Sequence, residues 1–204
     1  MRLGWVATTA LLCTLTAHGQ IAAPSEHALN ALTQIDALPA AAALTDAFAP
    51  APAFDDLIQL ALNSDHAGDL GVQLRAIHAL PTFCPTEPTA RVACAQNTLV
   101  HDTLIQIIEN DQLTQHTPQD TLCLRAAVEA LGATRSGLES DVIELVPLLG
   151  NGNRDVRATV ARALHNICNI QAKAPLQARY AIEPILQVRI EILSAIQDLN
   201  QCTP

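Results

Sequence analysis

The sequence predicts an all-α protein built as a solenoid of helix pairs, and three observations lead to this fold class. Half of the 204 residues are hydrophobic but only 2% are aromatic, and the apolar residues are mostly Ala, Leu and Ile, which suit closely packed helices. Glycine is sparse, and the alternation typical of strands is absent. A pair of unlike apolar segments also recurs every few tens of residues, which is typical of a helical solenoid. The paired segments are 57–63 with 76–80, 104–110 with 127–131, and 145–151 with 160–164.

Residues 1–19 are expected to be a signal peptide. A short positive start precedes an apolar run over 6–16, and small residues at Ala17 and Gly19 favour cleavage between Gly19 and Gln20. A membrane anchor, the competing interpretation, needs about 20 uninterrupted apolar residues, and this run ends at Ala17. We therefore expect an exported protein, periplasmic or extracellular, whose mature chain has no integral membrane segment.

Residues 20–53 are rich in Ala and Pro, and two interpretations stay open for them. They form either an N-terminal cap of two short helices over the first repeat or a flexible tail. Residues 54–204 are expected to form one repeat domain in which each repeat holds a first and a second helix. The repeats are expected at about 54–83, 88–132, 138–170 and 175–200. The expected first helices span 54–63, 88–110 and 138–149, and the second helices span 71–80, 117–132 and 154–169.

The third repeat carries the pattern most clearly. Residues 148–164 read Leu-Leu-Gly-Asn-Gly-Asn-Arg-Asp-Val-Arg-Ala-Thr-Val-Ala-Arg-Ala-Leu. This segment resembles a HEAT (armadillo-like) repeat, and the same pattern occurs in the phycobilin-lyase class of HEAT-like proteins. The resemblance implies a right-handed α-solenoid of HEAT-like helix pairs, and it implies that Asp155 and Arg157 tie neighbouring repeats together. Repeats one and two lack the Val-Arg step, so the specific motif occurs once.

Five cysteines follow the expected cleavage site, and in an exported chain they predict disulfides. A bridge between Cys84 and Cys94 closes a short loop between the first two repeats. A bridge between Cys168 and Cys202 joins equivalent ends of parallel second helices in adjacent repeats. Cys123 occupies a core position and stays outside both predicted bridges, because pairing it with Cys94 would join helix ends that lie far apart.

No catalytic, metal-binding or cofactor motif is recognised, so we expect a non-catalytic protein without a cofactor. The histidines are scattered, HExxH is absent, and His101-Asp102 lacks the further ligands of an HD-type phosphohydrolase. The chain holds 20 Asp and Glu against 11 Lys and Arg. This acidic surplus repels phosphate backbones, so nucleic acid is not an expected partner.

One set of residues is a candidate partner-binding stripe, because its members lie opposite the core positions of the second helices. Either they border a partner site or they form an ordinary solvated helix face. We expect a scaffold that binds a protein or peptide partner. The alternative is a lyase-like HEAT enzyme or a small-ligand carrier, which predicts a deep groove with converging acids and bases. The stripe residues are His78, Arg125, Glu129, Arg162 and His165.

Overall fold

The protein is all-helical throughout the part of the chain that its structure, a computed structural model, describes. Every regular element there is an α-helix or a short 3-10 helix, which confirms the all-α prediction. In the part of the chain that the structure describes, no helix is both long enough and apolar enough to cross a membrane. The predicted signal peptide and its cleavage site, Gly19–Gln20, lie outside the described residues. The described ranges are 25–33, 38–49, 53–62, 69–84, 98–113 and 117–202.

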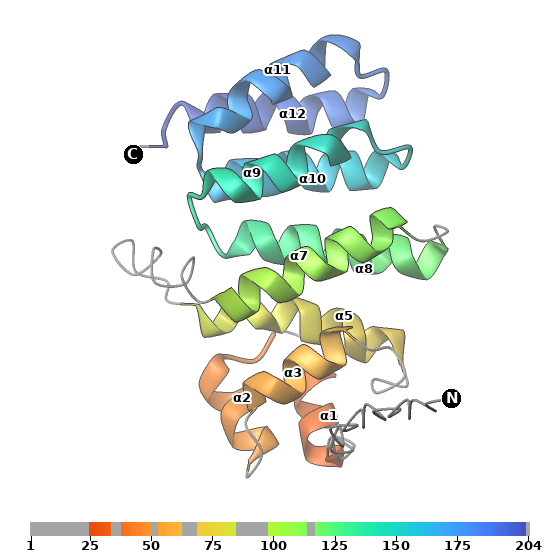
Figure 1. Cartoon of the computed structure of the whole chain (residues 1–204), viewed down its shortest axis with the longest axis vertical. Helices are drawn as coiled ribbons and strands as arrows, with labels where there is room; N and C mark the ends of the chain where they lie inside the picture. The colour runs from red at the N-terminus through yellow and green to blue at the C-terminus, as the bar shows by residue number, and fades with distance from the viewer. Residues whose placement is uncertain are drawn as a thin grey trace, which may run out of the picture.

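The helices form two layers that follow the long axis of the molecule (Figure 1). The first layer holds α3 (Ala53–Leu62), α7 (Thr98–Leu113), α9 (Glu139–Leu145) and α11 (Lys173–Ile182). The second layer holds α5 (Leu70–Ala79), α8 (Pro118–Ala133), α10 (Arg154–Ile167) and α12 (Leu186–Leu199). Within the second layer α5 packs on α8, α8 on α10, and α10 on α12. This continuous row of helices positions the surface considered below.

The N-terminal end of the two layers is covered by α1 (Glu26–Leu32) and α2 (Ala41–Phe48). These helices pack on each other, α1 also contacts α5, and α2 contacts α3. They bury Leu32, Leu44 and Phe48, each at most 4% exposed. Their outward positions are mainly polar, as at Glu26 and Asp46. The N-terminal cap expected for residues 20–53 stays a prediction, and 25–33, 38–49 and 53 are the part of that segment that the structure describes.

Local sequence determines where the second-layer helices begin. The Thr117 hydroxyl accepts the backbone N–H of Asp120 at 3.1 Å, and the Asp120 carboxylate accepts the N–H of Thr117 at 2.9 Å. This reciprocal capping box, followed by Pro118, satisfies donors that the first turn of α8 leaves unpaired. The side chains of Asn153 and Asp69 each accept one backbone N–H, from Asp155 and Gly71, and so cap α10 and α5. The predicted start of α8 at Thr117 is therefore confirmed.

Small residues allow the second-layer helices to approach closely. Val156, Val160 and Leu164 of α10 are at most 1% exposed and recur at the spacing of one helix face. Gly132 of α8 lies against Ala163 of α10, and a Cβ atom at Gly132 would stand 2.7 Å from the Ala163 Cα. The contact between α8 and α10 therefore requires glycine at this position, because backbone atoms cannot yield as a side chain can.

The first helix of the third repeat is shorter than the sequence predicts. The expected span was 138–149, but α9 ends at Leu145 and a 3-10 segment, Val146–Gly150, follows. Pro147 explains the change, because its ring lacks the N–H that an α-helix interior requires. In the second repeat α7 continues to Leu113, three residues beyond the expected end. Its expected start at Pro88 lies outside the described residues.

Cys168 and Cys202 form a disulfide with their Cα atoms 5.5 Å apart, and this is the pair that the sequence predicts. Cys168 adopts a left-handed backbone with φ of 62° and ends α10. Cys84 is also disulfide-bonded, and its predicted partner Cys94 lies outside the described residues. Cys123 is half-buried beside the core, where its Sγ donates to Gln73 Oε1 at 3.5 Å.

Candidate functional site

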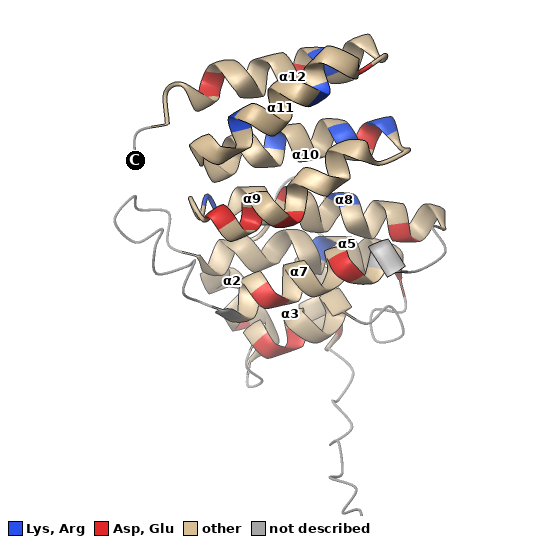
Figure 2. Cartoon of the chain, turned by 45° about the horizontal axis from the view of Figure 1, so that its top comes forward, with Lys and Arg blue, Asp and Glu red and all other residues tan. Residues whose placement is uncertain are grey.

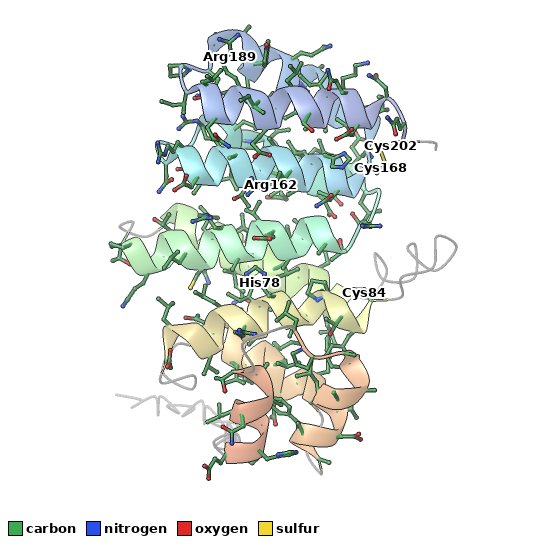
Figure 3. The ribbon with its side chains drawn as sticks, turned by 180° about the vertical axis from the view of Figure 1, so that it is seen from behind. His78, Cys84, Arg162, Cys168, Arg189 and Cys202 are labelled. Atoms are coloured by element: carbon green, nitrogen blue, oxygen red, sulfur yellow. A yellow bond between two sulfur atoms is a disulfide. The ribbon has the colours of Figure 1, made fainter. Side chains whose placement is uncertain are left out.

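The predicted stripe residues gather on the outer side of α5, α8 and α10. Together with α12 these helices form what we call the second-helix face, and Figure 3 shows His78 on α5 and Arg162 on α10. Glu129 and Arg162 are exposed, whereas His78, Arg125 and His165 are half-buried. The predicted stripe residues therefore lie on successive helices of one layer, and in the structure some of them contact charged residues of a neighbouring helix.

Two of these contacts join α10 to α12. The Nη1 atom of Arg162 lies 3.4 Å from Glu191 Oε1, and His165 Nε2 lies 3.9 Å from Asp198 Oδ2. The sequence left the register of the fourth repeat open, because these two acids fall where earlier repeats place apolar side chains. In the structure α12 packs inward through other residues, and the acids extend the charged surface by one helix. The buried residues of α12 are Val188, Ile192, Ala195 and Leu199.

His78 on α5 and Glu129 on α8 influence each other electrostatically. Burial lowers the pKa of His78; the negative charge of Glu129 opposes this shift, and the positive charge of Arg75 adds to it. The lowered pKa keeps His78 neutral at pH 7, and Arg75 and Arg125 add positive charges beside the negative charge of Glu129. The second-helix face therefore carries charges of both signs on α5 and α8 as well as on α10 and α12.

Arg125 borders a shallow hollow between the starts of α8 and α10. Within the described residues its Nε atom is buried without a hydrogen-bond partner, and the same holds for Nδ1 of His165. The hollow places Arg125 and Asp155 on neighbouring helices, so it offers charges of both signs to a ligand. Its lining residues are Pro118, Thr121, Leu122, Arg125, Asn153 and Asp155.

Arg157 links the last helix pair to α10 through Glu183. Its Nε and Nη2 atoms donate to the two carboxylate oxygens of Glu183 at 2.8 and 2.7 Å. Arg179 donates to the same carboxylate at 2.6 and 2.9 Å. Hydrogen bonding by Arg157, with help from Arg179, lowers the pKa of Glu183 to about 2 despite its burial. The contact is a buried, bidentate ion pair.

For Asp155 the role that the resemblance implies stays a prediction. Its exposed carboxylate lies 3.6 Å from Arg154 Nε, in its own helix. Asp155 is in the first turn of α10, where the carboxylate favours the helix N-terminus and faces the hollow beside Arg125.

The sequence analysis missed a polar cluster around Asp141, which is fully buried on α9. Its carboxylate contacts His101 Nε2 at 2.7 Å and accepts a hydrogen bond from the Ser136 hydroxyl. The hydrogen bond to Asp141 raises the pKa of His101, and Asp102 contributes in the same direction. A signal was present, since Asp141 is an acid in the first turn of a helix that follows a Ser-Gly turn.

This cluster contains serine, histidine and aspartate, but its connectivity is not that of a nucleophilic triad. In a triad the histidine stands between the hydroxyl and the carboxylate and removes the hydroxyl proton. Here Asp141 stands in the middle, and the Ser136 hydroxyl donates to the carboxylate instead of to His101. The arrangement neutralises a buried acid and fastens α7 to α9.

No family model, curated protein or solved structure matches this chain. Within the described ranges no group of three or more His, Cys, Asp and Glu side chains could hold a metal ion. The fold and the site thus define an all-helical protein whose distinguishing surface is a face of mixed charge across four adjacent helices.

Proposed function

We propose that the protein is an exported, non-catalytic scaffold that binds a protein or peptide partner on the second-helix face. The observation that carries this proposal is the alignment of charged residues across α5, α8, α10 and α12, which pack in sequence along one layer. A surface of this kind suits an extended polypeptide because it offers many polar contacts along one direction and no enclosed volume.

The proposed architecture is a right-handed α-solenoid of HEAT-like helix pairs. Two features support it. The helix order alternates between two layers, and each second-layer helix packs on the next. The motif at the start of α10 supplies Arg157, which ties α10 to the following pair through Glu183. Helix pairs stacked in this way bury a continuous core between neighbours and leave one extended face for binding.

The charges of the second-helix face indicate the chemistry of the partner. Glu129 is exposed, and the exposed Arg162 is paired with Glu191 only at 3.4 Å. Exposed ion pairs contribute little to folding, so they can exchange for partner charges at low cost. A partner segment that carries charges of both signs complements this pattern. Binding by such contacts weakens as salt concentration rises.

A binding assay with matched variants tests the proposal. The mature protein serves as bait in the exported fraction, beside a triple variant of His78→Ala, Glu129→Ala and Arg162→Ala. A control variant, Glu109→Ala with Glu139→Ala, removes exposed acids from the first layer. We expect a partner that the wild type and the control retain and the folded triple variant loses. Retention by all three proteins would contradict the assignment of the second-helix face.

Export has its own test, which does not depend on a partner. Mass spectrometry of the protein from the periplasm or culture medium should identify Gln20 as the first residue. A chain recovered only from the cytoplasm, with residues 1–19 still attached, would contradict the proposed localisation.

A further inference from the structure

The C-terminal end of the molecule exposes an apolar strip. Ile182, at the end of α11, is 72% exposed, and along α12 Leu186, Ile190 and Leu193 are 69%, 54% and 40% exposed. Residues 186, 190 and 193 follow the spacing of one helix face. We call these four residues the end strip. Contiguous exposed apolar side chains of this kind mark an interaction surface on a folded protein.

The α12 helix has the apolar pattern of a helix that is covered on two sides. Val188, Ile192, Ala195 and Leu199 bury its inner side, and α12 packs on α10 and α11. The end strip gives it a second apolar side. A helix that is apolar on two sides is normally covered on both, as α10 is by α8 and α12. The outer side of α12 therefore lacks one neighbouring layer.

The opposite end of the molecule cannot supply that layer. There α1 and α2 cover α3 and α5 and bury their own apolar side chains. The exposed residues of α1 are polar, as at Glu26 and Asn30, whereas on α2 Thr45 and Asp46 lie beside the small exposed Ala42 and Ala43. Leu38, just before α2, is 42% exposed. This end exposes less large apolar surface than the end strip, so a head-to-tail contact would bury polar side chains against it. A contact between two identical C-terminal ends instead joins apolar to apolar, and it closes after two chains.

The distribution of charge permits the same pairing, in which each copy brings one exposed guanidinium, that of Arg189, to the contact. The chain carries a net charge of −9, yet residues 154–199 hold six Lys and Arg against four Asp and Glu. In Figure 2 the basic residues gather toward α10, α11 and α12, and acids predominate over α3, α7 and α9. From Pro184 to Gln197 every exposed residue is uncharged except Arg189, which lies over the Tyr180 ring. Two copies meeting here do not bring carboxylates together.

We propose that the occupant of the end strip is a second copy of this chain, which gives a two-fold symmetric dimer joined through α12. The second-helix face stays open on each copy, so the dimer presents two partner-binding faces. This inference is independent of the partner proposed above, because it concerns a different surface.

Sedimentation equilibrium over a series of protein concentrations tests the dimer. We expect the full exported chain to have a dimeric mass, and we expect Ile190→Glu and Leu186→Glu, each tested alone, to have a monomeric mass with an unchanged helical circular dichroism spectrum. Ile143→Glu is the matched control, because Ile143 is a comparably exposed isoleucine (62%) on α9. It should leave the dimer intact.

Three results would overturn the proposal. The first is a monomeric wild type at every concentration. The second is a dimer that survives both glutamate variants. The third is an assembly whose mass keeps rising beyond two chains, which indicates head-to-tail growth. Added salt should leave the dimer intact because the contact is apolar, so dissociation by salt alone would also argue against the end strip.

Discussion

Removing the Glu183 carboxylate should destabilise the protein more than any exposed charge change. Glu183 accepts hydrogen bonds from Arg157 and Arg179, and the backbone N–H of Ile185 donates to it at 3.1 Å. In Glu183→Ala the buried Arg157 guanidinium keeps only backbone carbonyl acceptors. Removing one partner of a buried ion pair costs about 3–5 kcal/mol.

The pKa of Glu183 gives an independent magnitude. Its shift from 4.5 to about 2 corresponds to about 3 kcal/mol of stability. Because the folded pKa lies below the unfolded value, this stability is present above pH 4.5 and is lost as the pH falls toward 2. Glu183→Ala should therefore flatten the dependence of unfolding free energy on pH in this window.

Urea unfolding followed by circular dichroism, without reductant, measures both effects. Glu191→Ala is the matched control, because its partner Arg162 is exposed and such a pair contributes less than about 1 kcal/mol. A double variant, Arg157→Met with Glu183→Leu, should lose less than the sum of the single losses, because it removes the buried Arg157 charge together with its partner; Arg179 is half-buried and can turn to solvent. The reasoning is refuted if Glu183→Ala costs no more than Glu191→Ala.

Three further predictions follow from single contacts. Cys202→Ser opens the bridge to Cys168, which spans 34 residues, and should cost about 4 kcal/mol in the chain-entropy model; a reductant should lower the melting temperature of the wild type by more than that of this variant, in which the bridge of Cys84 remains. Gly132→Ala pushes a methyl group into Ala163 and should cost about 1–3 kcal/mol in urea unfolding; an equal or higher stability would contradict the close approach. The raised pKa of His101 stabilises the fold fully below pH 6.5, and this contribution is lost as pH rises through the folded value; His101→Gln should remove that dependence, as thermal melts from pH 5 to 9 can show.

The sequence predicts helices well where local chemistry determines them. Thr117 and Pro118 define the start of α8 without tertiary information, because capping involves only neighbouring residues. Pro147 is also apparent in the sequence. The apolar pattern continues on both sides of it, however, and therefore predicted an unbroken helix. The structure ends α9 before it, because a missing N–H outweighs periodicity.

The periodic pattern of apolar residues could not predict contacts between residues that are far apart in the sequence. Glu191 and Asp198 looked irregular because the sequence does not show that Arg162 and His165 lie across from them. Asp141 was overlooked because its role depends on a contact with His101, which is 40 residues away in the sequence. The stripe itself could be predicted, because its members lie at equivalent positions on the outer side of their helices. Their contacts with residues of the neighbouring helix could be found only in the structure.

The helices α10 and α12 are attached to each other at both ends. At the start of α10, Arg157 binds Glu183, which lies just before α12, and at its end Cys168 is bonded to Cys202, which lies just after α12. Because the ion pair and the disulfide link the two helices at opposite ends, α12 cannot rotate relative to α10. We therefore expect the last helix pair to move together with α10. Reduction of the disulfide removes one of these two links. We then expect the far end of α12 to move relative to α10, with the ion pair between Arg157 and Glu183 as the hinge.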